Sequence, residues 1–264
     1  VDMVYEEAKK NTKVYTLGPI IHNEQVVSEL EDRGVTAVDG IEELEGEKDA
    51  TLIIRSHGVP REVLQKLEEQ EIHYVDATCP FVKKIHDTVH KFSEEGYEIL
   101  IIGNRTHPEV KGILGWTKDS GTVIENEQEA RQYVSRYPEK KKCVVAQTTF
   151  NYKKFQYLVE ILEEKGYSIY DVNTVCNATA VRQKEAEELA VRSEAMIVIG
   201  GTNSSNSRKL FDICKNQCEN TYFIQTAEDL SSIDLSSFAS LGITAGASTP
   251  NTIIQEVLRA CQKI

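Results

Sequence analysis

Val75-Asp76-Ala77-Thr78-Cys79-Pro80 and its echo, Asp171-Val172-Asn173-Thr174-Val175-Cys176-Asn177, are the two stretches that decide the fold. In each, a β-branched run ends in Asp or Asn and Thr, presents one cysteine and leads directly into an amphipathic helix. A thiol in that position lies at the carboxyl end of a strand and near a helix N-terminus, where the helix dipole stabilises a thiolate. The two stretches therefore predict a site that contains two cysteines.

Predicted strands alternate with predicted helices along the chain, which is typical of βαβ units with parallel sheets. Similar loops recur at a long interval, with 85 residues from His22 to His107 and 97 from Cys79 to Cys176. This period predicts several small α/β lobes in place of one long sheet. The predicted strands are Lys13–Leu17, Thr51–Ile54, Ile72–Asp76, Ile99–Ile102, Cys143–Ala146, Ser168–Val172, Met196–Ile199 and Ser240–Thr244.

The repeat predicts three similar parallel-sheet α/β lobes, residues 1–79, 80–176 and 177–264, arranged as a pseudo-threefold trefoil around a central site. The first and second lobes each end in a strand and a cysteine that lead into a helix, whereas the third ends after its helix. The helix predicted at the start of the chain follows no such cysteine. We therefore expect a strand and a third cysteine upstream of Val1, which would close the third lobe and meet Cys79 and Cys176.

The composition bounds the partners of this chain. Its 264 residues are 40% hydrophobic and 27% charged, which is the composition of a globular protein. A net charge of -12 argues against nucleic acid or an anionic membrane surface as a partner. No apolar run reaches the roughly 18 residues of a membrane span. No signal-peptide pattern is visible, so we expect a cytoplasmic protein whose six cysteines are reduced, metal-bound or buried.

Three thiolates that converge from three lobes fit a cluster of iron and sulfide better than a zinc ion. Structural zinc takes four ligands, usually close in sequence, whereas a cubane held by three thiolates keeps one iron open for substrate. The competing interpretation of Cys79 and Cys176 is that they are small buried hydrophobic residues. We adopt that interpretation for the remaining cysteines, Cys143, Cys214, Cys218 and Cys261.

Two strand ends rich in Gly and Ser, at 200–206 and 245–250, are typical of phosphate sites. In the first, backbone N–H groups and the hydroxyls of Ser204 and Ser205 point to one place as the strand turns into a helix. Loops of this kind also occur as ordinary helix caps, so each alone is a weak signal. Two in one lobe favour an anion site.

Three histidines, His22, His57 and His107, follow predicted strand ends, which is where open α/β sheets bind ligands. Imidazoles that donate to a diphosphate would let an acidic protein bind an anion without a cluster of lysines. A structural histidine with satisfied hydrogen bonds is the alternative at each position. His86 and His90 lie four residues apart on a predicted helix, and we interpret them as part of a solvated or partly packed face.

Glu109, two residues after His107, is the best candidate for a catalytic acid. A carboxyl group in a dry site can stay protonated near neutral pH and pass its proton to a leaving hydroxyl. The alternative is a carboxylate in the first turn of a helix, where the helix dipole favours it. Thr148 is placed to relay or position that proton.

The motifs IIHN, SHG, DATCP, THPE, QTT, VCNAT, NSSNS and TAGAS occur in this order along the chain. With them the chain resembles the 4-hydroxy-3-methylbut-2-enyl diphosphate reductases, the LytB-type iron-sulfur enzymes that complete the methylerythritol phosphate route to isoprenoids. The resemblance extends from near residue 1 to the C-terminus.

The resemblance implies a trefoil around a 4Fe-4S cluster held by three cysteines. Cys79 and Cys176 match two of them, and the third belongs to a GFC-type motif that this sequence does not contain. It also implies that Glu109 and Thr148 lie beside the substrate hydroxyl. The residues that match the family's diphosphate site are His22, His57, His107, Ser204, Ser205, Asn206 and Ser248.

The implied activity is a two-electron reductive dehydroxylation of the allylic diphosphate to isopentenyl and dimethylallyl diphosphates, the last step of that pathway. Since no nicotinamide fingerprint is visible, we expect ferredoxin or flavodoxin as the electron donor. Two other classes of protein stay open on the residues alone. One is a cluster-free protein that binds a phosphosugar or a nucleotide, and the other is a regulatory iron-sulfur sensor that does not consume the diphosphate.

Overall fold

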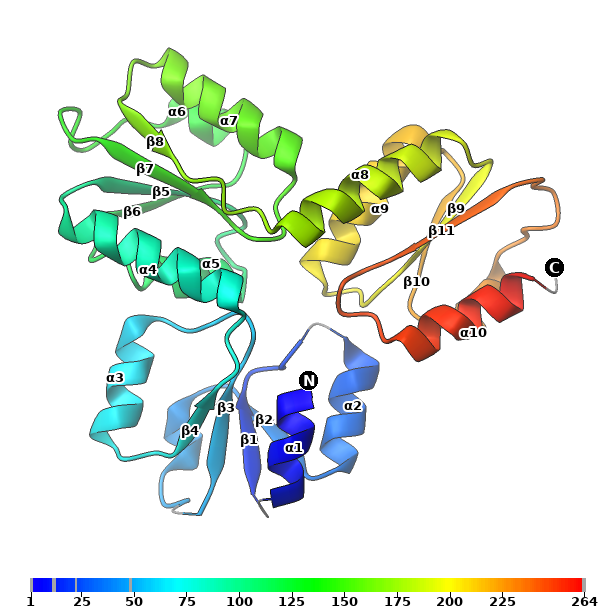
Figure 1. Cartoon of the computed structure of the whole chain (residues 1–264), viewed down its shortest axis with the longest axis horizontal. Coiled ribbons are helices and arrows are strands. Elements are labelled where there is room, and N and C mark those ends of the chain that lie inside the picture. Colours follow the sequence, from blue (N-terminus) through cyan, green and yellow to red (C-terminus); the bar gives the residue numbers. More distant parts are fainter. Residues whose placement is uncertain (1, 11–12, 22, 48, 263–264) are drawn as a thin grey trace. The chain divides into compact units, whose positions relative to one another are not determined.

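The computed structural model describes residues 2–10, 13–21, 23–47 and 49–262, and within them the chain forms three parallel sheets with helices between the strands (Figure 1). The sheets contain four, four and three strands. This confirms the predicted α/β class with three small parallel-sheet lobes, and three sheets are what a trefoil requires. In this described part of the chain, no helix is both long and apolar enough to cross a membrane.

The first sheet has the strand order β2-β1-β3-β4. Its central strand β3 is buried along its whole length, because Thr-Leu-Ile-Ile presents no charged side chain to either face. The strands are β1 (Val14–Leu17), β2 (Val35–Val38), β3 (Thr51–Ile54) and β4 (Tyr74–Asp76). The helices of this part of the chain are α1 (Asp2–Lys10), α2 (Glu24–Asp32) and α3 (Arg61–Glu69), with a 3-10 turn η1 (Ile41–Leu44).

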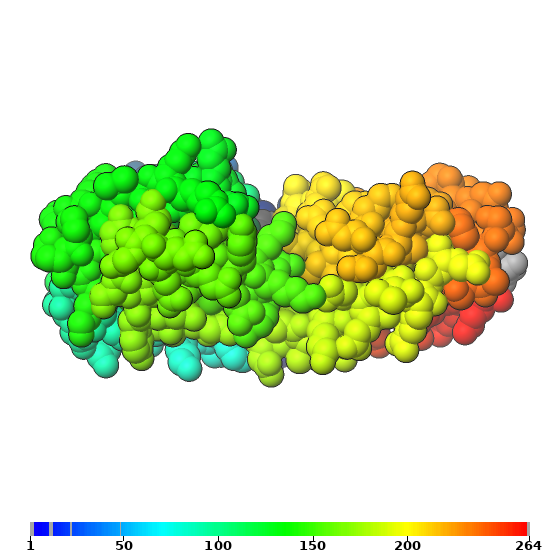
Figure 2. All heavy atoms as spheres, turned by 90° about the horizontal axis from the view of Figure 1, so that it is seen from above, coloured from blue at the N-terminus to red at the C-terminus, as the bar shows by residue number. Residues whose placement is uncertain are grey.

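The second sheet repeats this arrangement with the order β6-β5-β7-β8. Its strands are β5 (Glu98–Ile102), β6 (Gly121–Ile124), β7 (Lys142–Ala146) and β8 (Ile169–Asp171). Its helices are α4 (Pro80–Glu94), α5 (Pro108–Leu114), α6 (Glu127–Gln132) and α7 (Tyr152–Glu164). Helices α4 and α5 cover one face of the sheet and α6 and α7 the other (Figure 1). From the side of α6 and α7 the lobe, green in Figure 2, presents a closely packed surface.

The third sheet has the order β10-β9-β11. Its strands are β9 (Ala195–Ile199), β10 (Thr221–Ile224) and β11 (Leu241–Ala245). Helices α8 and α9 pack together on one face, and α10 packs on the other through Ile253 and Val257 (Figure 1). The helices are α8 (Asn177–Val191), α9 (Ser205–Gln217) and α10 (Asn251–Cys261), with a 3-10 turn η2 (Glu228–Ser232).

The same strand order underlies all three sheets. In each, the first strand in sequence pairs with the second on one side and with the third on the other, and in the four-stranded sheets the fourth pairs with the third. Among the described residues the third sheet has no fourth strand. The strand expected upstream of Val1 lies outside this sequence and stays a prediction.

The predicted lobe boundaries, 1–79, 80–176 and 177–264, each enclose the strands of one sheet. By contacts the chain divides into two compact units, one of residues 1–20 and 30–176, the other of residues 21–29 and 177–264. The first half of α2 therefore belongs to the same unit as the third lobe, and within it Asn23 Nδ2 donates to the carbonyl of Ser248 (3.3 Å). The boundaries themselves stay a proposal.

All eight predicted strands are present, each within two residues of its predicted ends. Three strands were missed, β2, β6 and β10. Each is an edge strand of four residues in which at least two side chains are half-buried or exposed. They therefore lack the continuous buried apolar run of a central strand. Asn23 caps α2, since Val26 N donates to Asn23 Oδ1 (3.2 Å), and Gly34 follows the helix with a φ of 83°.

A buried ion pair joins β5 and β7 at the amino-terminal edge of the second sheet. Lys142 is fully buried and Glu98 is 3% exposed, with Lys142 Nζ 3.2 Å from Glu98 Oε2. Lys142 Nζ also donates to the carbonyls of Tyr137 and Lys140 (both 2.6 Å), and Ser135 Oγ donates to Glu98 Oε2 (2.5 Å). Both charges are therefore paired and hydrogen-bonded, as burial requires.

Replacement of Lys142 by Ala is expected to lower the free energy of unfolding by roughly 3–5 kcal/mol, because it leaves the Glu98 carboxylate buried without its cation. Urea unfolding monitored by circular dichroism measures the loss. The paired variant Lys142→Met/Glu98→Gln removes both charges and is expected to recover most of it. An unfolding midpoint for Lys142→Ala equal to that of an exposed-lysine control, Lys66→Ala, would show that the pair contributes nothing.

Candidate functional site

The two cysteines at the carboxyl edges of the first two sheets occupy equivalent positions. Cys79 follows β4 and is the N-cap of α4, and Cys176 follows β8 directly before α8. Cys79 N donates to the carbonyl of Ser56 (3.0 Å), and Cys176 N donates to the carbonyl of Thr148 (2.9 Å). Each cysteine is thus held by the loop that follows the neighbouring strand, β3 or β7.

Polar side chains fix the turn that leads to each cysteine. Before Cys79, Asp76 Oδ1 accepts from Thr78 N (2.9 Å) and Asp76 Oδ2 pairs with Lys83 Nζ (2.6 Å). Burial would raise the pKa of Asp76, but the hydrogen bonds from Lys83 and Thr78 outweigh it and lower the pKa. Before Cys176, Thr174 Oγ1 donates to the carbonyl of Ala146 (2.6 Å) and accepts from its N–H (2.7 Å).

Cys79 and Cys176 have the exposure and the position expected of two ligands of a cluster that needs three. Both are free and half-buried, and both lie at helix N-termini, where a thiolate is stabilised. In the described part of the chain no three His, Cys, Asp or Glu side chains are grouped so that they could hold a metal ion. The chain therefore offers two of the three thiolates that the resemblance requires.

Glu109 and Thr148 lie together, as the sequence predicts for residues at adjacent strand ends. Glu109 is 2% exposed and Thr148 is 7% exposed. Glu109 Oε1 accepts from Thr148 N (2.5 Å), and Thr148 Oγ1 donates to Glu109 Oε2 (2.8 Å). Because a hydroxyl both donates and accepts, Thr148 Oγ can receive a proton from the carboxyl group and pass one on.

His107 is the N-cap of α5, and its ring nitrogen Nδ1 accepts from Glu109 N (3.1 Å). An accepting Nδ1 carries a lone pair, so in the neutral ring the proton is on Nε2. The ring of His107 meets that of His57 edge to face, with centroids 5.3 Å apart. The structure thus brings together two of the three predicted diphosphate-binding histidines. His22, the third, lies outside the described residues.

In the third lobe, Ser207 joins the two Gly-rich loops. A Cβ added to Gly200 would lie 2.2 Å from Ser207 Oγ, and one added to Gly246 would lie 2.0 Å from it, so only glycine fits at either position. Ser207 Oγ also donates to Ser204 Oγ (3.0 Å), which caps α9 by accepting from Ser207 N (3.3 Å). Ser204 is therefore a helix cap as well as a predicted ligand.

Asn206 and Ser248, from the two loops, have buried polar atoms with no hydrogen-bond partner among the residues that the structure describes. Asn206 is 5% exposed, and both its amide nitrogen and its amide oxygen are unsatisfied, as is Ser248 Oγ. Unsatisfied buried groups are costly, typically about 1–3 kcal/mol each, and are retained where a ligand satisfies them. Ser205, the remaining predicted ligand of this lobe, is the first residue of α9.

Two other predictions are resolved by the structure. His86 is buried, at 4% exposed, and stacks on Trp116, so the interpretation of a solvated or partly packed face applies only to His90. The packing interpretation of Cys143 and Cys214 is confirmed, since both are fully buried. Burial raises the pKa of each of these two thiols to about 12, which makes them inert.

The family model described as "LytB protein" matches residues 1–262. The chain belongs to the LytB family. It is 41% identical over its whole length to a 4-hydroxy-3-methylbut-2-enyl diphosphate reductase of Caldanaerobacter subterraneus, of which it covers 91%. It is 43% identical to the Geobacter metallireducens protein of the same name, with 99% of this chain and 91% of that protein covered.

Two solved structures are also similar to this LytB chain. The E-1-hydroxy-2-methyl-but-2-enyl-4-diphosphate reductase of Plasmodium falciparum has a TM-score of 0.91 and 26% identity, covering 98% of this chain and 81% of its own. A structure of (E)-4-hydroxy-3-methyl-but-2-enyl diphosphate reductase, described as the terminal enzyme of the non-mevalonate pathway, has a TM-score of 0.69 and 39% identity. The match covers 100% of this chain and 93% of that chain.

Sequence reasoning missed several residues that shape this LytB site. Gln147 accepts from Asn104 N (3.2 Å) and donates to Thr149 Oγ1 (3.1 Å), and so fixes the loops after β5 and β7. Its place in the QTT motif was the available signal. Ser207 had none, because its role depends on the approach of two loops that are distant in sequence.

The buried His86 predicts a pH dependence of stability. Burial, and secondarily the charge of Lys83, lowers its pKa to about 4 against the opposing effect of Asp76, while in the unfolded chain the pKa is about 6.5. Between these values only the unfolded state binds the proton, so stability is present above pH 6.5 and is lost as the pH falls toward 4, by up to roughly 3 kcal/mol. Urea unfolding at pH 5 and pH 7 is expected to differ less for His86→Gln than for the unaltered protein. An equal difference would exclude His86 as the group responsible.

Proposed function

We propose that this chain reduces 4-hydroxy-3-methylbut-2-enyl diphosphate to isopentenyl and dimethylallyl diphosphates. The single observation that carries the proposal is the buried Glu109–Thr148 pair beside the two histidines. A carboxyl group, a hydroxyl and two imidazoles meet there at the carboxyl edge of parallel strands. That set can deliver a proton to a leaving hydroxyl and hold an anion nearby.

The reaction consumes two electrons and two protons. The bond from the allylic carbon to the hydroxyl oxygen breaks, one proton converts that oxygen to water, and the other protonates one end or the other of the allyl unit to give the two products. We assign the first proton to Glu109, with the Thr148 hydroxyl orienting the carboxyl group and the substrate oxygen. The 2.8 Å contact between them supports this assignment, because proton transfer requires hydrogen-bond reach.

We assign diphosphate binding to His22, His57, His107, Ser204, Ser205, Asn206 and Ser248. The unsatisfied polar atoms of Asn206 and Ser248 support this assignment, since a phosphate oxygen can accept from either. His107 Nδ1 accepts from Glu109 N, so a neutral His107 ring carries its proton on Nε2, a donor of the kind that a phosphate oxygen accepts from. In a chain of net charge -12 these neutral donors let an anion bind without a cluster of cations.

We assign Cys79 and Cys176 as ligands of a 4Fe-4S cluster, with the third cysteine in the segment expected upstream of Val1. When bound, such a cluster supplies electrons and a Lewis-acidic iron. The protein contributes the binding and orientation of the diphosphate and the delivery of the proton. We infer ferredoxin or flavodoxin as the source of electrons and the cytoplasm as the location.

Glu109→Gln in the full-length protein, prepared without oxygen, is expected to lower kcat by about 10²–10⁴-fold, because the amide cannot donate the proton. The visible absorbance and iron content should stay unchanged. Turnover is measured with a chemical reductant, and Glu160→Gln, an exposed residue of α7, is the matched control. Turnover near that of the control would exclude Glu109 as the acid.

The same preparation separates the other two classes. A colourless, iron-free protein would favour the phosphosugar- or nucleotide-binding alternative. A protein with iron and sulfide that leaves the allylic diphosphate unchanged in the presence of reductant would favour the sensor. Formation of both five-carbon diphosphates supports the proposal.

A further inference from the structure

The turn that carries His57 packs against the second lobe through glycines. Gly58 has a φ of 71°, and a Cβ there would lie 2.5 Å from His86 Cε1. On the facing helix α5, a Cβ on Gly112 would lie 3.5 Å from the carbonyl oxygen of His57. After that helix, one on Gly115 would lie 2.4 Å from Pro60. The backbone of residues 57–60 therefore lies close against α5 and against the imidazole that His86 extends from α4.

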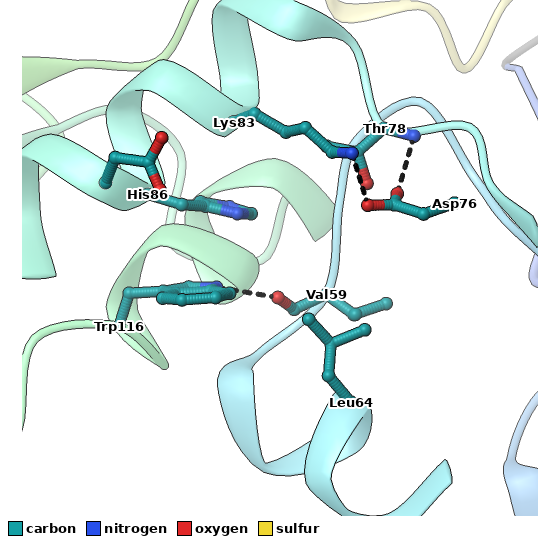
Figure 3. Close-up of a pocket in the computed structure, with 8 residues that line it drawn as sticks. Val59, Leu64, Asp76, Thr78, Lys83, His86 and Trp116 are labelled. Atoms are coloured by element: carbon teal, nitrogen blue, oxygen red, sulfur yellow. Dashed lines mark hydrogen bonds and ion pairs between the residues drawn. The ribbon is translucent and has the colours of Figure 1, made fainter. Parts of the chain in front are cut away.

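Trp116 and His86 complete this contact. Their rings stack with centroids 5.1 Å apart and planes 16° from parallel, and Trp116 Nε1 donates to the carbonyl of Val59 (3.0 Å), as Figure 3 shows. This is a hydrogen bond from the second lobe to the turn of the first, two residues beyond His57. His90 adds an edge contact to the Trp116 ring at 6.1 Å.

A cavity of about 270 Å³ lies beside the stack, lined by Val59, Leu64, Asp76, Thr78, Lys83, His86, Asp87 and Trp116 (Figure 3). Val59 itself packs into the core of the first sheet, whereas the side of the turn that faces the cavity is open. On that open side the hydrogen bond from Trp116, with the imidazole stacked above its ring, holds the turn to the second lobe.

We propose that Trp116, supported by His86, is a positioning residue that sets the place of His57 relative to His107. The position of the His107 ring does not depend on the 57–60 turn, because its Nδ1 accepts from Glu109 N and so caps α5. The spacing of the two imidazoles, 5.3 Å between centroids, is therefore set by where the 57–60 turn lies. This inference rests on the proposed function, since it assigns that spacing to diphosphate binding.

The test is Trp116→Phe in the full-length protein, which keeps an aromatic ring and removes the N–H donor. Inorganic pyrophosphate is the binding probe, titrated calorimetrically, and KM and kcat are measured for the allylic diphosphate. Loss of the hydrogen bond is expected to raise Kd and KM together by about five- to tenfold and to change kcat by less than about twofold, because binding weakens equally in the ground and transition states. His86→Leu, which removes the stacked imidazole, is expected to give the same KM-selective change.

Phe92→Leu is the matched control, since it removes an aromatic pair with Tyr97 (4.8 Å) from the same helix α4. It is expected to lower the unfolding temperature and leave Kd and KM unchanged. If the unaltered protein binds pyrophosphate and both Trp116→Phe and His86→Leu bind it equally well, the positioning role is wrong while the proposed function stands. Failure of the unaltered protein to bind pyrophosphate would overturn both.

Discussion

The hydrogen bonds from the cysteine amides to the loops after β3 and β7 are the constraint on which the site depends. In parallel sheets neighbouring strands end at the same edge, so a residue after β4 must lie beside the loop after β3. The hydrogen bonds from Cys79 N to the carbonyl of Ser56 and from Cys176 N to the carbonyl of Thr148 hold each cysteine at a fixed distance from the neighbouring loop. In the second lobe one backbone hydrogen bond thereby links Cys176, which carries the thiol, to Thr148, which carries the hydroxyl proposed to position the proton.

The same arrangement would let an acidic protein bind the diphosphate that we propose as its ligand. The donors are an imidazole N–H, an amide and hydroxyls, and none of them adds a net charge that the rest of the chain must balance. Helix N-termini contribute further, since α5 begins at Pro108 immediately after His107, and α9 begins at Ser205. Lys142, which is fully buried, lies instead at the opposite edge of the second sheet, where it stabilises the fold.

Much of this could be predicted from the sequence because the deciding signals are local. The central strands are continuous apolar runs, and the chemical residues follow them directly, as Glu109 follows β5 by a few residues. Glu109 and Thr148 were each singled out by their motifs, and they meet because β5 and β7, which they follow, are neighbours in the sheet. What could not be predicted depends on contacts between distant segments. The edge strand β6 has only one buried side chain, and the stacking of His86 on Trp116 depends on how α4 packs beside the segment that follows α5.

The central claim is that Cys79 and Cys176 bind one cluster that faces Glu109 and His107. A crystal structure of the full-length protein, prepared without oxygen and measured at the iron absorption edge, tests it most directly. The account predicts one compact iron signal within bonding distance of both Sγ atoms, with Glu109 and His107 around the open side. Iron at neither sulfur, or the two sulfurs directed into separate sites, would contradict it.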